Sequence, residues 1–487
     1  MDSGAPLSFD ARPVATPPGG PLAVELVPAP DPWAVARKLA HLPHLLFLDS
    51  AEKHADRGRY SYVAASSTGL PHFGRLPHEQ GSDFQWWVDA IRRCVPAPTV
   101  PGLPPFQGGF GGLFGYDLAS EFERILPPRR DEFSCPPLAI NCYAWVISFD
   151  HHTGRAWIVT SGNPFTAGRE RFESAERNLR FVQSVFQANH SISSRATQPL
   201  CKLAPQHPLP GFPGVTSNFS REGYEAAVRR AVEYVHAGDC FQVNISQRLL
   251  APLREHPLEL YGRLRELNPA PFAAYFDLGD FQILSASPER FLRVHPDGEV
   301  ETRPIKGTRP RGRTPEEDAA LVRDLATSPK DRAENVMIVD LLRNDIGKVC
   351  EYGSVRVPRV CEVETFRFVH HLVSEVRGKL RPGLGPLDLL AAAFPGGSVT
   401  GAPKVRAMEI IAELEPTARG PYCGCLGWVG FDGAMDTNIL IRTFTAGRGW
   451  VQFPVGGGVV ADSDPAREYE ETLHKAAGLL RSLKTED

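Results

Sequence analysis

The chain has 487 residues, which is enough for two or three ordinary domains or for one large intertwined domain. Hydrophobic residues make up 42% and charged residues 23% of it, as in a soluble globular protein. The formal net charge of −4 excludes the basic excess that is typical of proteins bound to nucleic acid or to an anionic membrane. An anionic ligand would therefore have to be held by local groups.

The N-terminal segment, MDSGAPLSFDARPVATPPGG, lacks the apolar core of a signal peptide, and no later run is long and apolar enough to span a membrane. The nine cysteines include one close pair, Cys423 and Cys425, whose spacing differs from the CxxC of zinc or redox sites. We therefore expect a cytoplasmic protein with reduced thiols that binds neither nucleic acid nor a membrane.

Two ordered blocks are predicted, joined by a linker. The first covers residues 20–187, with strand-like alternation at 60–66 and 142–150 and a charged helical run at 167–187. Residues 188–217 are polar and rich in proline, which is linker composition. The second block, 218–487, opens with a helix that Ser220 caps.

Strand-like segments in the second block are FQVNISQRLLA (241–251), PFAAYFDLG (271–279), FQILSASP (281–288) and CGCLGWVGFD (423–432). Helical patterns cover 332–345 and 468–483. Runs of strands separated by helices, without regular βαβ alternation, predict an α+β fold with antiparallel sheets.

Three glycine-rich stretches, FQGGFGGLFGYD, FPGGSVTGAPK and FPVGGGVVADSDP, do not have the spacing of a phosphate-binding loop. Tight turns or close strand packing would explain them. The functional alternative is that their backbone N–H groups approach a carboxylate.

Two predicted helices begin with acidic pairs. Ser328 is the expected cap of the first, which places Asp331 and Glu334 on one face; Asp464 is the expected cap of the second, with Glu468 and Glu471. Such paired carboxylates could hold a hard divalent ion together with ligand oxygens, although a solvated acidic face is the commoner explanation.

A lone lysine, Lys306, lies among arginines, prolines and glycines in RPIKGTRPRG (303–312). A cationic neighbourhood makes an amine harder to keep protonated. The stretch is therefore either a solvated basic loop or the surroundings of an amine nucleophile.

Taken together, the motifs resemble those of the chorismate-utilising enzymes, a family that includes the anthranilate, aminodeoxychorismate, isochorismate and salicylate synthases. The resemblance runs from about residue 49 to the C-terminus, with the motifs in family order: PFQGGFGGLFGYD, AGDCFQVNISQR, SASPERFL, RPIKGTRPRG, DRAENVMIVDLLRND, FPGGSVTGAPKVRAM, IRTF and GGGVVADSDPAREYEET. It implies a large α/β sandwich of two packed antiparallel sheets with helices outside, in which both blocks interweave.

The resemblance also implies the roles of site residues. Glu334 and Glu471 would bind Mg²⁺, Glu468 would support the ion through water, and Asp331 replaces a frequent glutamate. Glu289 would be the general acid/base that protonates a leaving hydroxyl, because hydroxide is a poor leaving group. The implied contacts to the substrates are Arg442, Tyr422, Lys404, Ser398, His371, Gln242 and the loop of Gly456, Gly457 and Gly458, whose amides would meet a carboxylate.

Two positions bear on the reaction. Gln242 occupies the place of the lysine base in the water-adding members, which favours ammonia as the nucleophile. Lys306 lies in PIKGT, as in aminodeoxychorismate synthases, whereas anthranilate synthases have PIAGT. The resemblance thus implies that the chain acts as component I of an aminodeoxychorismate synthase and that Lys306 is its covalent nucleophile. Component I of an anthranilate synthase and an inactive chorismate-binding scaffold subunit remain alternatives.

The implied partners follow from the same resemblance. Ammonia would come from a separate glutamine amidotransferase subunit, since no glutaminase domain is evident, and the product would lead to p-aminobenzoate and folate. Residues 268–272 (NPAPF) and 48–51 (LDSA) resemble two walls of a tryptophan pocket. The serine and tyrosine hydroxyls of the usual NPSPY are missing, which leaves room for bound tryptophan but argues against inhibitory control.

Overall fold

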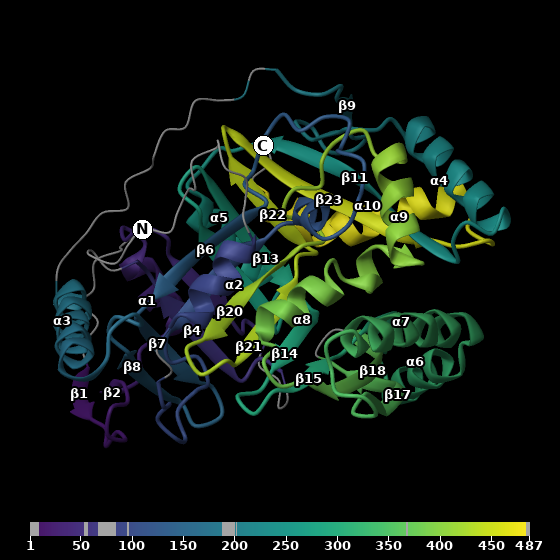
Figure 1. Cartoon of the computed structure of the whole chain (residues 1–487). Helices are drawn as coiled ribbons and strands as arrows, with labels where there is room; N and C mark the ends of the chain where they lie inside the picture. Colours follow the sequence, from purple (N-terminus) through teal and green to yellow (C-terminus); the bar gives the residue numbers. More distant parts are fainter. Residues whose placement is uncertain are drawn as a thin grey trace.

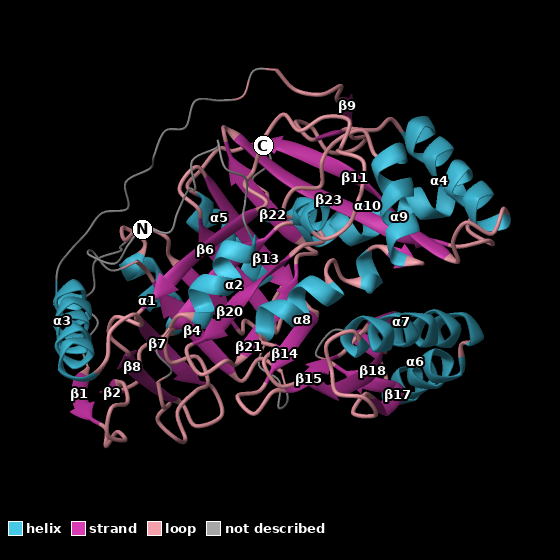
Figure 2. Ribbon diagram, in the orientation of Figure 1, coloured by secondary structure: helices cyan, strands magenta, loops and turns pink. Residues whose placement is uncertain are grey.

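The computed structural model describes residues 9–52, 57–66, 84–94, 97–187, 200, 202–366 and 369–483. Its strands form two antiparallel sheets, with helices on the outside (Figure 1, Figure 2). The predicted α+β sandwich is therefore confirmed. Among the described residues, no helix combines the length and the apolar composition needed to cross a membrane.

The first sheet takes strands from both predicted blocks. In spatial order it contains β1 (Asp10–Pro13), β2 (Leu22–Val27), β8 (Arg155–Thr160), β7 (Trp145–Asp150), β4 (Tyr60–Ala64), β3 (Leu46–Asp49), β12 (Phe272–Asp277), β13 (Phe281–Ser287), β22 (Thr443–Gly447), β23 (Trp450–Val459), β11 (Gln242–Pro252), β10 (Thr216–Ser217) and β9 (His207–Pro208), with β19 (Gly401–Ala402) beside β11.

The second sheet is also shared. Its order is β16 (Ile305–Pro310), β18 (Val369–Lys379), β15 (Glu299–Thr302), β14 (Arg290–Val294), β21 (Met435–Ile439), β20 (Cys425–Gly430), β5 (Gly109–Phe114) and β6 (Leu138–Tyr143), with β17 (Arg356–Thr365) on β18. The block boundaries at 187 and 218 remain predictions, and residues 188–199 and 201 of the expected linker lie outside the described residues.

The helices cover the outer faces (Figure 2). They are α1 (Pro32–Leu39), α2 (Phe84–Arg92), α3 (Gly168–Gln187), α4 (Arg221–His236), α5 (Pro257–Leu267), α6 (Pro315–Thr327), α7 (Pro329–Gly347), α8 (Pro386–Ala393), α9 (Lys404–Leu414) and α10 (Pro465–Ser482), with 3₁₀ turns η1 (Tyr116–Glu121) and η2 (Gly397–Val399). In Figure 1, α6 and α7 lie together over β17 and β18, whereas α4, α9 and α10 gather beside β11 and β23.

An apolar core joins the two sheets. Leu46 of β3 and Phe276 of β12 belong to the same buried cluster as Leu113 of β5 and Leu426 of β20. The sheets approach so closely that a β-carbon at Gly111 would lie 2.6 Å from Leu46 Cδ2. The glycines of FQGGFGGLFGYD thus serve close strand packing, the structural explanation given above.

The sequence pattern at 142–150 predicts one strand, and the structure contains two. β6 ends at Tyr143 in the second sheet, and β7 begins at Trp145 in the first, with Ala144 between them. Every residue of the segment is buried, so the apolar pattern does not mark the point where the chain changes sheets.

Candidate active site

A cavity of about 440 Å³ opens between β16, β23 and the first turns of α7 and α10. Most of the residues predicted to act on a ligand line this one cavity. They are Glu289, Lys306, Asp331, Glu334, His371, Ser398, Tyr422, Arg442, Gly456, Gly458, Glu468 and Glu471.

Lys306 reaches the cavity from an irregular strand. The pairing of β16 with β18 shifts register between Ile305 and Thr308, and Gly307 has a φ of +79°. Such a bulge turns a side chain out of the ladder. The Lys306 ammonium nitrogen, Nζ, donates to the Ser398 carbonyl oxygen at 3.2 Å. Burial lowers the pKa of Lys306, against the opposing effect of the Glu334 carboxylate. The amine is therefore easier to deprotonate than an exposed one.

Glu289 is a buried acid in the same cavity. Its carboxyl oxygen Oε1 accepts a hydrogen bond from the Ser398 hydroxyl at 3.0 Å. Burial raises the pKa of Glu289 to about 7, although the Ser398 hydrogen bond and the Lys306 charge act in the opposite direction. A carboxylic acid with this pKa can give or take a proton near neutral pH.

His371 is an uncharged polar wall of the cavity. Its Nδ1 is 2.9 Å from the hydroxyl of Thr308. Burial lowers the pKa of His371 to about 3, and the charges of Arg442 and Arg57 add to the effect. The imidazole is therefore neutral near pH 7.

The caps of α7 and α10 are as predicted. The Ser328 hydroxyl accepts from the Asp331 backbone N–H at 3.3 Å, and Asp464 Oδ1 accepts from the Arg467 N–H at 2.9 Å. The carboxylates of the first two turns of each helix line the cavity: Asp331 and Glu334 of α7, and Glu468 and Glu471 of α10. Asp331 is already paired with Arg309 at 3.0 Å, so Glu334 is the α7 carboxylate left to meet a ligand.

The remaining carboxylates fit a divalent cation. Burial raises the pKa of Glu334 and of Glu468, and the neighbouring Glu471 charge raises both further. The Glu468 oxygen Oε2 is buried and has no hydrogen-bond partner in the described part of the chain. Within the described part of the chain no three acidic, histidine or cysteine side chains converge as a ready metal site. Magnesium needs only one or two protein carboxylates, since waters and ligand oxygens complete its shell.

The three glycines lie in a strand, which corrects the prediction of a loop. Gly456 and Gly458 are paired with Ser246 and Asn244 of β11 and line the cavity. Gly457 alternates toward α10, where a β-carbon would lie 2.9 Å from Glu468 Oε2. Bare backbone in β23 thus makes room on both of its faces.

Lys404 lies away from the cavity lining, contrary to the prediction that placed it beside the substrate pocket. Its Nζ pairs with Asp345 Oδ2 at 2.6 Å, and both side chains are buried. This ion pair joins α9 to α7. The amine is committed to that contact and is not aimed at the cavity.

Gln242 is fully buried beside Gly458, and neither atom of its amide has a hydrogen-bond partner among the described residues. It is absent from the residues that line the cavity.

Lys475 and Asn244 line the cavity and were missed by the sequence interpretation. Lys475 Nζ pairs with Glu471 Oε1 at 2.7 Å and donates to the Gly456 carbonyl at 2.9 Å. Its spacing of four residues from Glu471 is the signal that could have found it. For Asn244 the signal was its two-residue spacing from Gln242 on one strand face.

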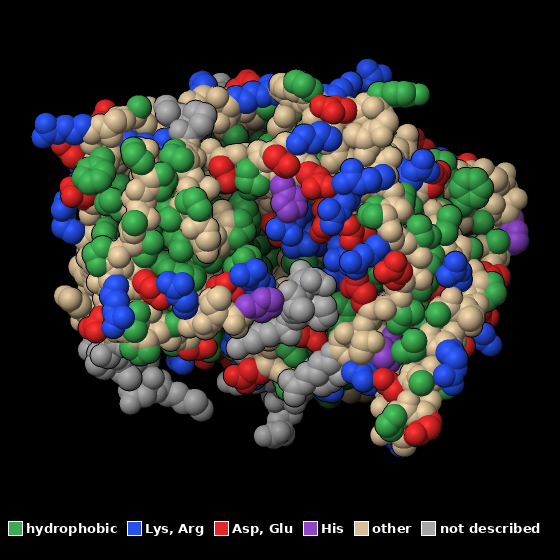
Figure 3. All heavy atoms as spheres, turned by 90° about the horizontal axis from the view of Figure 1, so that it is seen from below, with side chains coloured by type: hydrophobic (Ala, Val, Ile, Leu, Met, Phe, Trp, Pro, Cys, Tyr) green, Lys and Arg blue, Asp and Glu red, His purple; other side chains and the backbone are tan. Residues whose placement is uncertain are grey.

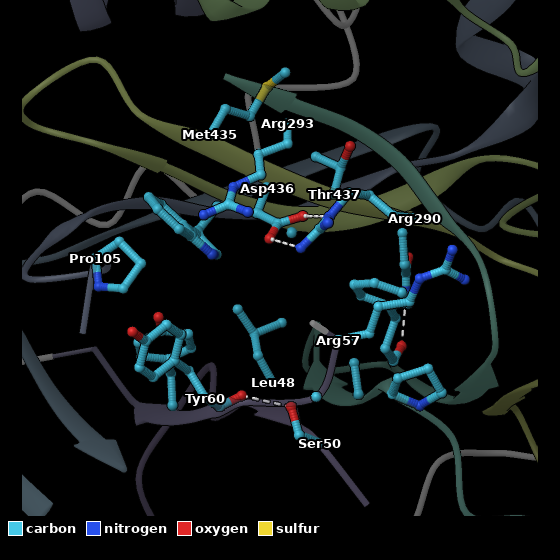
Figure 4. A pocket seen from close by; sticks show the side chains of 18 of the residues that line it. Leu48, Ser50, Arg57, Tyr60, Pro105, Arg290, Arg293, Met435, Asp436 and Thr437 are labelled. Atoms are coloured by element: carbon cyan, nitrogen blue, oxygen red, sulfur yellow. Dashed lines mark hydrogen bonds and ion pairs between the residues drawn. The ribbon is translucent and has the colours of Figure 1, made fainter. Parts of the chain in front are cut away.

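A second cavity, of about 280 Å³, lies where the predicted walls of an amino-acid pocket meet. Figure 4 shows the two sides of this cavity, with Arg290, Arg293 and Asp436 facing Leu48, Ser50 and Tyr60. The guanidinium of Arg290 is bound to Asp436 at 2.9 and 3.0 Å. The guanidinium of Arg293, by contrast, lines the cavity without a hydrogen bond or ion pair to a described side chain, although its charge acts on Glu301.

Comparison with known families shows which family the chain belongs to. The model of the chorismate binding enzyme family matches residues 88–481. The chain belongs to this family. As a chorismate-binding enzyme it presents the acid, the amine and the paired carboxylates in one cavity.

Relatives of this chorismate-binding enzyme have two different names. It is 44% identical over 402 residues to anthranilate synthase component 1 of Thermus thermophilus, covering 81% of each chain. It is also 44% identical over 396 residues to aminodeoxychorismate synthase component 1 of Klebsiella aerogenes, again covering 81% of each. The crystal structure of anthranilate synthase component I from Streptococcus pneumoniae matches with a TM-score of 0.70 at 32% identity and covers 90% of both chains. Overall identity therefore does not separate the two activities.

Proposed function

We propose that this enzyme converts chorismate and ammonia into 4-amino-4-deoxychorismate, as component I of an aminodeoxychorismate synthase. The observation that carries the proposal is Lys306: an amine with a lowered pKa lines the cavity that also contains the buried acid Glu289. Both side chains hydrogen-bond to Ser398, so that nucleophile and acid are held by one short segment.

The proposed reaction has two displacements. The neutral amine of Lys306 bonds to C2 of chorismate, the diene electrons shift, and the C4–O bond breaks. The departing hydroxide takes the proton of Glu289 and leaves as water.

Ammonia then bonds to C4, the diene electrons shift back, and the C2–N bond breaks to release Lys306 as an amine. The ammonium group on C4 returns one proton to Glu289. The sum is chorismate plus ammonia giving 4-amino-4-deoxychorismate plus water. Without the lysine, ammonia would attack C2 and lead to the ortho product, anthranilate.

Substrate carboxylates would meet the guanidinium of Arg442, the Tyr422 hydroxyl and the bare backbone at Gly456 and Gly458, all of which line the cavity. Magnesium would be held by Glu334 and Glu471, with Glu468 supporting it. When bound, the ion would neutralise a substrate carboxylate and draw electron density toward itself.

The ammonia source would be a separate glutamine amidotransferase subunit, and the product would serve the synthesis of p-aminobenzoate and folate. The names of the relatives as a "component 1" support a two-subunit enzyme.

The deciding experiment identifies the isomer formed. Purified protein receives chorismate, magnesium and an ammonium salt, and an aminodeoxychorismate lyase is then added. We expect p-aminobenzoate to form only after the lyase. Direct release of anthranilate would instead support the second candidate, component I of an anthranilate synthase, which the Thermus thermophilus relative favours. If no product forms even with an amidotransferase present, the result would support the remaining alternative, an inactive chorismate-binding scaffold subunit.

A Lys306→Ala variant tests the covalent role. We expect the para product to fall by about a thousandfold or more, because the first displacement loses its nucleophile. Intact-mass spectrometry of the wild type with chorismate alone should detect the adduct. Lys379→Ala, which removes an exposed lysine that pairs with Asp297, is the charge-matched control. Para product that persists in Lys306→Ala would remove the covalent role.

The second cavity supports a binding site for tryptophan. The carboxylate of an amino acid would meet the free guanidinium of Arg293, and its ring would pack among the aromatic side chains of Tyr60, Tyr62 and Trp428. Calorimetric titration of the wild type and of Arg293→Leu with tryptophan tests this site, and equal heats from both would rule out the proposed contact.

A further inference from the structure

Asn244 lines the active-site cavity, and the oxygen of its side-chain amide is an unused hydrogen-bond acceptor. The residue is 7% exposed, and its oxygen Oδ1 is buried without a partner among the described residues. The neighbouring strand leaves space for it, because a β-carbon at Gly456 would lie 2.9 Å from Oδ1. Buried polar atoms in folded proteins are normally hydrogen-bonded, so an acceptor kept in this state indicates a donor that arrives with a ligand.

The backbone places Asn244 beside the segment that holds the reacting groups. The Asn244 N–H donates to the Thr400 carbonyl at 2.7 Å. Arg419 donates to the carbonyls of Asn244 and Val399, at 2.9 and 3.1 Å. Lys306 and Glu289 are hydrogen-bonded to Ser398, the residue before Val399. Three residues, Ser398 to Thr400, thus join the acid, the amine and the unused acceptor.

The chemistry of the two substrates selects what this acceptor binds. The carboxylates and ether oxygen of chorismate are acceptors and cannot donate to Oδ1. The one hydroxyl of chorismate has left as water in the first displacement, so it is no longer a donor on the ring when the second displacement begins. Ammonia has three N–H donors, and an acceptor that takes one of them leaves the nitrogen lone pair free to attack carbon.

We propose that Asn244 binds the ammonia nucleophile, with Oδ1 accepting an N–H while the lone pair faces the ring. This inference rests on the proposed use of ammonia and adds the residue that positions it. In the second displacement the held nitrogen forms the C4–N bond as the bond from C2 to Lys306 breaks.

The test separates the two substrates. The steady-state KM for ammonia, supplied as ammonium chloride, and the KM for chorismate are measured for wild type, Asn244→Leu and Asn244→Ser. We expect both variants to raise the KM for ammonia about tenfold, the effect of one lost hydrogen bond, while the KM for chorismate stays within about twofold. Adduct formation from chorismate alone should be unchanged. A raised KM for chorismate and slower adduct formation at an unchanged KM for ammonia would overturn the proposal.

A control and a second nucleophile exclude a merely structural effect. Asn218 is a buried asparagine next to β11 that lines neither cavity, and its amide donates to Thr417 at 2.9 Å. Asn218→Ser should leave the KM for ammonia unchanged, and an equal rise would contradict the assignment. Asn244→Ser should also use methylamine better relative to ammonia than wild type does, because the shorter side chain makes room for the methyl group.

The outcome is distinguishable from failure of the proposed function. If the wild type releases anthranilate, the para assignment fails, yet ammonia is still the nucleophile and the KM comparison still decides the role of Asn244. If ammonium supports no turnover at all, both proposals fall together.

Discussion

Burial acts on Glu289 and Lys306 in opposite directions that suit one reaction. It raises the pKa of the acid and lowers the pKa of the amine, so that each is moved toward its uncharged form. Protonated Glu289 can release hydroxide as water, and neutral Lys306 has a free lone pair. Two side chains bound to Ser398 thereby have complementary proton states.

Replacing Glu289 with glutamine should stabilise the protein at alkaline pH. The unfolded carboxyl loses its proton near the ordinary pKa of 4.5, whereas the folded one keeps it to about 7. Stability due to this group is therefore full below pH 4.5, falls as the pH rises to 7, and stays low above that. We expect Glu289→Gln to raise the free energy of unfolding at pH 8 by about 2 kcal/mol and to change it little at pH 4. Urea melts at the two pH values measure this, and equal shifts at both would contradict the raised pKa.

The first two turns of α7 and α10 face the same cavity. Two helices from distant parts of the chain bring Glu334, Glu468 and Glu471 there, and the charge of Glu471 raises the pKa of the other two. In the structure as it stands, Lys475 supplies a positive charge to Glu471.

Magnesium should raise the melting temperature through these carboxylates. We expect magnesium with chorismate to raise the Tm of the wild type by ~2 °C or more, since a ligand that binds the folded state stabilises it. Glu334→Gln combined with Glu471→Gln should abolish the magnesium-dependent part. Glu470→Gln is the matched control, because this neighbour on α10 pairs with Arg221 at 2.9 Å and is absent from the cavity lining. An undiminished response in the double variant would rule out the proposed site.

The ion pair between α9 and α7 should serve stability and not substrate binding. Lys404→Met removes the closer cation from the buried carboxylate of Asp345, which keeps Lys348 at 3.3 Å, and we expect a loss of about 3 kcal/mol. Adding Asp345→Leu should recover much of this loss. The variants that fold should have a KM for chorismate near that of the wild type. A raised KM for chorismate at unchanged stability would instead support the predicted role of Lys404 in substrate binding.

The sequence predicted the features that depend on residues close together along the chain. Helix caps at Ser328 and Asp464, and the acidic faces behind them, follow from spacing along the sequence. The partner of Lys404 could not be predicted in this way, because Asp345 comes from another helix and only packing brings the two together. The space around the Asn244 oxygen likewise depends on Gly456, which lies 212 residues further along the chain (456 − 244).

At the scale of the molecule, neither predicted block can complete a sheet alone. β12 of the second block pairs with β3 of the first, and β20 pairs with β5. The face in Figure 3 mixes acidic and basic side chains, in keeping with the net charge of −4.

A fragment of residues 218–487 should therefore fail to fold, although it contains every residue that lines the active-site cavity. Removing β3 and β5 exposes the apolar core between the sheets and leaves β12 and β20 as unpaired edges. We expect circular dichroism of the fragment to give no cooperative thermal transition, whereas the full chain should melt cooperatively. A cooperative fragment that binds chorismate would contradict the shared-sheet architecture.

The shared sheets also set the order in which a ribosome can finish this protein. Asp49 leaves the ribosome long before Ala273, the residue it faces across the completed ladder. During translation the backbone N–H and C=O groups of the early strands stay unpaired until their partner strands are synthesised. Such strand edges are prone to pair with other chains. Nascent chains of this enzyme should accordingly depend on holding chaperones until synthesis passes β20.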